Sequence, residues 1–266
     1  MSRVTPGAQV RIDAVSRYFD ASDGDRMIAL DAVSLDIRAN EFIALVGPSG
    51  CGKSTLLRIL AGLIKPSAGS VSVNGEKLGA PRERTGMVFQ AATLLPWTNV
   101  LDNILFPVRV TGQPVTPELQ ARAEALIQVA GLQGFEKRWP RELSGGMQQR
   151  VAICCALLND PDLLLMDEPF GALDALTREE MTLELLRIWA VRPKTVVFVT
   201  HSISEAVLLA DRVVVMSARP GRIADVIDIT LPRPRAFNMS ALPAFTEASE
   251  RIREQIFKRS NVPAHD

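Results

Sequence analysis

The sequence predicts an α/β fold built around a parallel β-sheet. Residues 42–46 form a continuous apolar run, which is typical of a strand buried on both faces. Further strand-like apolar runs return at residues 163–166, 196–200 and 213–216, with helical stretches between them. Because strands that alternate with helices usually pair in parallel through crossover helices, this pattern indicates the fold class.

The composition is that of an ordinary globular protein. The chain has 266 residues, 47% of them hydrophobic, with 30 Lys plus Arg and 30 Asp plus Glu. A zero net charge argues against bare nucleic acid as the main partner, because phosphate binding needs a basic surplus. The 3 cysteines are too few for a disulfide framework and indicate a reducing compartment. Residues 1–10 lack a signal-peptide core and no run approaches about 18 apolar residues, so we expect a chain that does not cross a membrane by itself.

Residues 1–91 are predicted to hold strands around a first helix. Residues 28–37 alternate loosely, and residues 70–73 alternate strictly before Asn74-Gly75, a pair that favours a hairpin because both positions tolerate positive φ. The buried strand at 42–46 leads into a glycine-rich loop, and a helix at 54–62 closed by a glycine follows.

The rest of the chain divides into three predicted parts. Residues 92–157 read as a mostly helical insertion, in which Thr116-Pro117 is a helix cap followed by a first-turn proline. Residues 158–220 complete the α/β core. Residues 221–266 contain several prolines and a charged helical stretch at 247–258, which we interpret as a short C-terminal appendage.

A phosphate-binding loop is the most specific motif. Gly47-Pro48-Ser49-Gly50-Cys51-Gly52-Lys53-Ser54 fits G-x-x-x-x-G-K-[ST] at every fixed position, between the buried strand and a helix. Glycines let backbone N–H groups point at a triphosphate, Lys53 adds a positive charge, and the Ser54 hydroxyl can ligate Mg²⁺. The alternative is a glycine-rich turn without a ligand. The glycine spacing does not fit a dinucleotide fingerprint.

The cysteines are interpreted as structural. Cys51 is a loop filler rather than a redox sensor, although its place beside a helix N-terminus predicts a lowered thiol pKa and access to alkylating reagents. Cys154-Cys155 lacks the C-x-x-C spacing or histidine cluster that would favour a metal site.

Two carboxylates and a histidine stand at the ends of later strands. Asp167-Glu168 follows the run at 163–166, and His201 follows the run at 196–200. In NTPases with a phosphate loop, an aspartate at such a strand end holds Mg²⁺. Because successive strand residues point to opposite faces, Glu168 remains to position and polarise the attacking water. His201 lies where ligands bind in parallel sheets, which makes it a candidate γ-phosphate contact, and a histidine without a role is the equal alternative.

One segment resembles the signature motif of the ABC (ATP-binding-cassette) ATPases. Its sequence is Leu143-Ser144-Gly145-Gly146-Met147-Gln148-Gln149-Arg150. Further motifs match in the family's order over about residues 10–220: the Walker A from Gly47 to Thr55, the Q-loop at Gln90, the Walker B at 163–168, the D-loop at Gly171-Ala172-Leu173-Asp174, and the switch histidine His201. Residues 94–97, 167–176 and 188–189 are similar to nitrate, sulfonate and taurine importer ATPases. The chain departs from the family at Cys154-Cys155, where Ala-Arg is usual.

The resemblance implies a P-loop NTPase of the ABC ATPase type, with a parallel-sheet core, an N-terminal antiparallel β-subdomain and a helical insertion that carries the signature. It implies catalytic roles for Glu168, His201 and Gln90, and Mg²⁺ ligation by Ser54, Gln90 and Asp167. An aromatic residue near the start of the fold would stack on adenine. Phe19 is at the matching position, and its neighbour Tyr18 is the alternative.

The signature implies a second copy of the chain. Ser144 is an N-cap serine followed by two glycines, so this helix end is a further anion site. The resemblance implies a head-to-tail dimer in which Ser144, Gly145, Gly146 and Asp174 bind ATP held by the Walker A of the other copy. Binding of ATP would then join the subunits, and hydrolysis would loosen them.

The function implied is that of the ATP-hydrolysing subunit of an importer, with ATP and Mg²⁺ as cofactors. Such a subunit would lie on the cytoplasmic face of the inner membrane, bound to separate transmembrane permease subunits through residues 90–99 and the helical insertion. An external solute-binding protein would be an indirect partner, and no nucleic acid would be one. The alternatives are a non-transport ABC ATPase acting on DNA or ribosomes, whose usual coiled-coil insertion, tandem cassettes or basic surplus are not visible, and a nucleotide-binding module without catalysis. The solute is not encoded in this chain.

Overall fold

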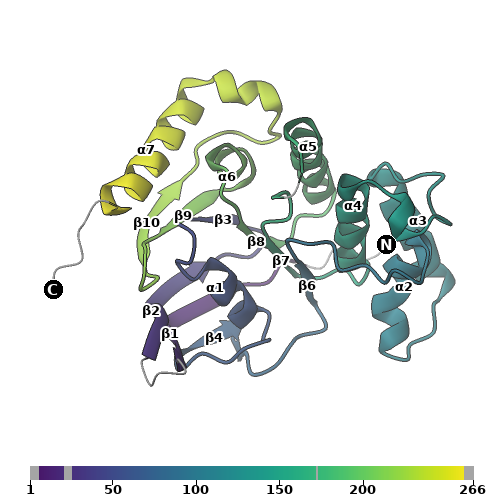
Figure 1. Ribbon diagram of the computed structural model, residues 1–266, viewed down its shortest axis with the longest axis horizontal. Helices are drawn as coiled ribbons and strands as arrows, with labels where there is room; N and C mark the ends of the chain where they lie inside the picture. The colour runs from purple at the N-terminus through teal and green to yellow at the C-terminus, as the bar shows by residue number, and fades with distance from the viewer. Residues whose placement is uncertain (1–5, 21–25, 172, 261–266) are drawn as a thin grey trace.

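A six-stranded sheet forms the centre of the protein. The structure, a computed structural model, describes residues 6–20, 26–171 and 173–260 (Figure 1). The strands of the central sheet are β3 (Phe42–Val46), β6 (Thr85–Val88), β7 (Leu163–Asp167), β8 (Thr195–Val199), β9 (Arg212–Met216) and β10 (Ile223–Asp228). They lie in the order β10-β9-β3-β8-β7-β6, with β10 antiparallel to β9 and every other pair parallel. The predicted parallel α/β core is confirmed.

A second, antiparallel sheet is built from the N-terminal part of the chain. Its strands are β1 (Val10–Asp20), β2 (Arg26–Ile37), β4 (Ala68–Val73) and β5 (Glu76–Lys77), in the order β2-β1-β4-β5. Asn74 and Gly75 turn β4 into β5 with φ values of 54° and 82°, so the predicted hairpin is confirmed. Helix α1 (Lys53–Leu60) and this sheet share one hydrophobic cluster with Ile43 and Leu45 of β3.

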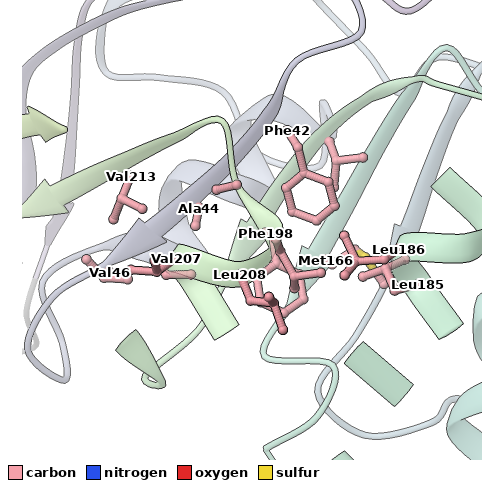
Figure 2. Packing of buried hydrophobic residues seen from close by; sticks show 14 of the residues in the cluster. Phe42, Ala44, Val46, Met166, Leu185, Leu186, Phe198, Val207, Leu208 and Val213 are labelled. Carbon is pink, nitrogen blue, oxygen red and sulfur yellow. The ribbon is translucent and has the colours of Figure 1, made fainter. Parts of the chain in front are cut away.

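Helices of the core cover most of the opposite face of the central sheet, and α4 (Gly145–Leu157) packs against β6 there. The core helices are α5 (Ala175–Val191), α6 (Ile203–Leu209) and α7 (Pro243–Ser260). Figure 2 shows Phe42, Ala44 and Val46 of β3 on this side, with Val207 and Leu208 of α6 beside them. Alternate residues of β3 therefore pack into two different clusters, which explains why its sequence is apolar throughout.

The helical insertion has a core of its own. It contains α2 (Val100–Val110), α3 (Pro117–Val129), the short 3₁₀ helix η1 (Pro140–Glu142) and α4 (Gly145–Leu157). Thr116 caps α3 by accepting a hydrogen bond from the Leu119 N–H at 3.3 Å, as the sequence predicts. In Figure 1, α4 lies between α3 and α5 and so connects the insertion to the core. No helix in the described ranges is long and apolar enough to span a bilayer.

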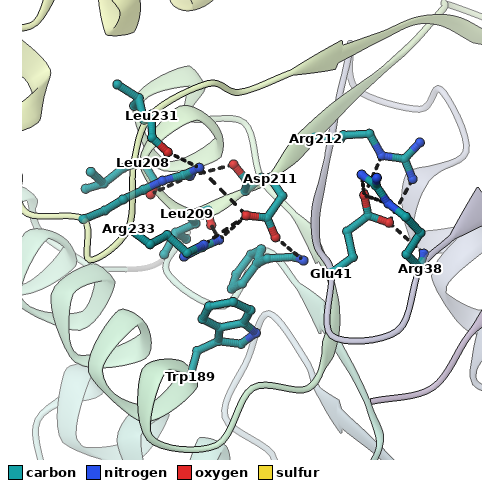
Figure 3. Close-up of polar contacts among 12 residues, drawn as sticks. Arg38, Glu41, Trp189, Leu208, Leu209, Asp211, Arg212, Leu231 and Arg233 are labelled. Carbon is teal, nitrogen blue, oxygen red and sulfur yellow. Dashed lines mark hydrogen bonds and ion pairs between the residues drawn. The ribbon is translucent and has the colours of Figure 1, made fainter. Parts of the chain in front are cut away.

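The C-terminal segment is fastened to the core by arginines (Figure 3). Arg233 lies 2.7 Å from Asp211 and stacks 4.1 Å from the centre of the Trp189 ring. Arg235 donates to carbonyl oxygens at the end of α6, those of Val207, Leu208 and Ala210. A second 3₁₀ helix, η2 (Phe237–Ala241), then leads into α7, whose Phe245 and Ile252 are buried in the main cluster. This segment packs directly on the α/β core.

Candidate active site

A cavity of about 350 Å³ opens where the central strands end. The phosphate loop follows β3, Glu168 follows β7, and His201 follows β8, and parallel strands bring these ends to one edge of the sheet. The second sheet supplies an apolar wall. The lining residues are Phe19, Met27, Ile28, Ala29, Ser49, Gly50, Gly52, Lys53, Ser54, Thr55, Glu168, His201 and Arg219. The structure thus gathers residues from several distant segments around one space.

The phosphate loop holds a buried cation. Gly52 caps α1 with φ 91°, and a Cβ there would lie 2.6 Å from Leu30 Cδ2, so only glycine fits this position. Lys53 is 5% exposed and donates from Nζ to the carbonyl oxygens of Gly47 at 2.9 Å and Pro48 at 3.0 Å. Among the described residues no carboxylate pairs with Lys53. Because buried charges are normally paired, this ammonium marks the loop as an anion site.

Two oxygen atoms that could ligate a metal ion lie together beside the loop. The Ser54 hydroxyl at the start of α1 donates to Asp167 Oδ1 at 2.9 Å, across 113 residues of sequence. Hydroxyl and carboxylate oxygens are hard ligands of the kind that Mg²⁺ prefers, and Mg²⁺ usually takes one or two carboxylates and completes its shell with phosphate and water. The residues present therefore fit a magnesium ion bound together with a nucleotide.

Glu168 is held in an unusual backbone conformation. Its φ is 47°, in the left-handed region that costs a non-glycine residue about 1–3 kcal/mol. Its Oε1 lies 2.7 Å from His201 Nε2, and its Oε2 accepts a hydrogen bond from Gln90 Nε2 at 3.4 Å. The three residues proposed from the sequence as catalytic are thus in contact. Local strain at such a cluster is an observation that points to function.

The signature residues form a separate group. Ser144 caps α4 by accepting from the Met147 N–H at 3.3 Å, and Asp174 caps α5 by accepting from the Thr177 N–H at 3.0 Å. A Cβ at Gly146 would lie 2.6 Å from Thr177 Cγ2, so the two helix N-termini are side by side. Ser144, Gly145, Gly146 and Asp174 do not line the 350 Å³ cavity. Ala172, in the same D-loop motif, lies outside the described residues.

The two aromatic candidates for stacking on adenine, Phe19 and Tyr18, differ in their position relative to the cavity. Phe19 lines the cavity and Tyr18 does not. The guanidinium of Arg17 lies 4.8 Å from the centre of the Phe19 ring, and that of Arg26 lies 5.7 Å from the centre of the Tyr18 ring. Phe19 is therefore the aromatic residue placed to meet a ligand in this space.

The predicted lowered pKa and accessibility of the Cys51 thiol are wrong, whereas its interpretation as a loop filler agrees with its burial. The residue is 1% exposed, and burial raises the pKa of its thiol even though Lys53 lies close and acts in the opposite direction. The nearby helix end is visible in the sequence, whereas the burial that desolvates the thiol depends on tertiary packing. Burial likewise raises the pKa of the Cys154 thiol and raises that of Cys155 to about 12. These thiols stay protonated at neutral pH.

Sequence reasoning missed Arg219. This residue follows β9 and lines the cavity, and its Nη2 lies 3.0 Å from the place that a Cβ on Gly50 would occupy. It adds a second positive charge at the phosphate loop. No periodicity or spacing singles it out, because the packing of β9 beside β3 is what brings it there.

Together the fold and the site define a P-loop nucleotide-binding protein. The family model described as ABC transporter matches residues 30–171, and the chain belongs to that family. It therefore binds ATP, and the enzymes of this family hydrolyse ATP.

Two curated relatives and one solved structure are similar along most of their length. The chain is 41% identical to an aliphatic sulfonates import ATP-binding protein of Bacillus cereus, over 94% of this chain and 95% of the relative. It is 47% identical to a taurine import ATP-binding protein of Roseobacter denitrificans, over 80% and 79%. A dimeric ATP-binding cassette in a post-hydrolysis state, bound to ADP and phosphate, matches with 32% identity and a TM-score of 0.74, over 84% of this chain and 100% of the cassette.

Proposed function

We propose that this chain is the ATP-hydrolysing subunit of an ABC importer for a small solute of the sulfonate, taurine or nitrate kind. One observation carries the hydrolytic part of the proposal. The buried Lys53 ammonium, which has no carboxylate partner in the described part of the chain, lies at the same cavity as the Glu168–His201 pair. A site for the phosphates and a group able to activate water therefore face one another. The printed names of the relatives support the import part.

The candidate residues at and beside the cavity have distinct proposed roles. Lys53 and the loop from Gly47 to Thr55 bind the β- and γ-phosphates, and Phe19 stacks on the adenine. Ser54, Asp167 and Gln90 hold Mg²⁺, which supplies Lewis-acid stabilisation of the phosphate charge. Glu168 orients the attacking water and accepts its proton, while His201 positions the Glu168 carboxylate and contacts the γ-phosphate.

The signature residues and Asp174 complete the nucleotide site of another copy of the chain. Ser144, Gly145, Gly146 and Asp174 lie together but outside the 350 Å³ cavity, so they are free to meet a nucleotide held by a partner subunit. The N-termini of α4 and α5 there offer N–H groups to an anion. The dimeric cassette among the similar solved structures supports this arrangement. ATP then joins two subunits head to tail.

Attachment to the membrane occurs through permease subunits that bind the segment after Gln90. Leu94 is half-buried and packs against the core of the helical insertion, whereas Trp97 is 67% exposed. Leu94 therefore packs inward, whereas Trp97 is exposed on the surface where a partner can dock. Trp97 serves as the anchor in a permease groove, on the cytoplasmic face of the inner membrane. An external solute-binding protein delivers the solute, and nucleic acid has no part.

A growth assay tests the importer function. The gene is deleted in its host, and the strain is grown with taurine or an alkanesulfonate as the only sulfur source, or with nitrate as the only nitrogen source. Growth on one of these should fail and return with the wild-type gene but not with Lys53→Ala. If deletion leaves uptake of all three solutes unchanged while the purified chain hydrolyses ATP, the importer function for these solutes is refuted.

A further inference from the structure

A second cavity, of about 560 Å³, lies between α3 of the helical insertion and α5 of the core. Both helices pack against α4, which Figure 1 shows between them. The proposed ATP-site residues do not line this space. Its wall is apolar: Leu126 and Val129 come from α3, and Ile188 and Val191 come from α5. Val129 is 43% exposed and Val191 is 77% exposed, so apolar surface faces water here.

One end of the cavity carries a cluster of cations around a single carboxylate. The Asp160 carboxylate lies 2.8 Å from Arg122 Nη2, 3.3 Å from Lys194 Nζ and 3.6 Å from Arg192 Nη1. Glu118 also lines the cavity, but it is at the first turn of α3 and is hydrogen-bonded to Thr116. Three cations therefore share one partner at this end.

The Lys194 side chain is the least satisfied member of the cluster. It is 8% exposed, and within the described residues its ammonium has one hydrogen-bond acceptor, Asp160 Oδ1. An ammonium carries three N–H donors. Burial lowers the pKa of Lys194, and the charges of Arg122 and Arg192 act in the same direction, against Asp160. An additional anion at this point would supply the missing acceptors and balance the charge.

We propose that this cavity binds an amphipathic organic anion, with a sulfonate or carboxylate head at Lys194, Arg192 and Arg122 and an alkyl chain along the apolar wall. The cavity volume falls within the range of small-molecule sites, about 300–1,000 Å³. Such a ligand touches both α3 and α5, so it ties the helical insertion to the core at a place remote from the phosphate loop. The proposal does not depend on the importer function.

Calorimetry with short-chain probes tests the proposal. Sodium hexanesulfonate and sodium hexanoate are titrated into the full chain while ADP saturates the nucleotide site. Hexanol, which has the chain without the charge, and sodium sulfate, which has the charge without the chain, are the matched probes. At least one of the two alkyl anions should bind more tightly than hexanol and sulfate by about tenfold or more, because the charged head and the alkyl chain each contribute to the binding free energy. The preferred head group identifies the class of anion.

Surface variants locate the binding. Arg192→Gln should weaken binding of the alkyl anion about tenfold by removing a charged donor, and Val129→Asp should abolish it by placing a carboxylate on the apolar wall. Arg187→Gln is the control, because Arg187 lies on α5 near Arg192, is 75% exposed and pairs with Glu184 outside this cavity. The three variants are compared at equal thermal stability and equal ADP affinity. Equal binding of hexanol and the alkyl anions, or an affinity that neither cavity variant changes, would overturn the proposal.

Discussion

Replacing Glu168 with glutamine should nearly stop ATP hydrolysis and leave ATP binding intact. The Glu168 carboxylate lies 2.7 Å from His201 Nε2 and accepts a hydrogen bond from Gln90 at 3.4 Å. A glutamine keeps the size of the side chain but loses the negative charge that polarises water. A positioned general base contributes about 10²–10⁴ in rate, which corresponds to about 3–5 kcal/mol of barrier. We therefore expect turnover at about 1% of the wild-type rate or less.

The assay separates hydrolysis from binding. Phosphate release is measured at saturating ATP and Mg²⁺, ATP affinity is measured by displacement of a fluorescent nucleotide, and size-exclusion chromatography with ATP follows the dimer. Glu168→Gln should bind ATP with wild-type affinity and accumulate as a dimer, since Lys53, Ser54 and Asp167 are untouched. Glu124→Gln makes the same chemical change at an exposed position of α3 and should keep full turnover. Wild-type turnover by Glu168→Gln would refute the role of Glu168 in activating water.

Three further predictions address binding, assembly and reactivity. Lys53→Ala should lose measurable ATP binding. A mixture of Lys53→Ala with Ser144→Arg subunits should show ATP-dependent pairing that neither variant shows alone. Absence of pairing in the mixture would contradict a site shared between two subunits. Trp97→Ala should lower permease affinity by about 2–4 kcal/mol and leave the melting temperature of the isolated subunit unchanged, so a lower melting temperature with intact assembly would make Trp97 a core residue. Iodoacetamide should label Cys51 at least about tenfold more slowly in the native chain than in urea at pH 8, because burial raises its pKa and blocks access, and equal rates by mass spectrometry would refute this.

Local features of the fold were predictable because they depend on residues close in sequence. The N-caps at Thr116 and Ser144 and the hairpin at Asn74-Gly75 rest on side-chain reach and on backbone φ preferences. The apolar run of β3 reflects burial on both faces of the sheet, which a short window of sequence already shows. The order of the motifs also pointed to the family before any contact was known.

Other features required the packing of distant segments. The contact between Ser54 and Asp167 and the contact between Glu168 and His201 join separate strands, so spacing along the chain could suggest them but not place them. Arg219 reaches the phosphate loop only because β9 pairs with β3. Cys51 shows the limit most directly: the nearby helix end predicts a lowered pKa, whereas the tertiary structure buries the thiol and raises it.

The sequence by itself therefore determined the α/β class and the phosphate loop, since these follow from local propensity and short-range spacing, and the resemblance of its motifs to the ABC ATPases supplied further candidate residues such as Gln90 and Phe19. Only the tertiary structure decided which candidates share a cavity, and it placed Ser144 and Asp174 apart from Lys53. It also brought Arg122, Asp160 and Lys194 together from three segments. Burial and charge pairing depend on what other parts of the chain pack nearby, and that information is long-range by nature.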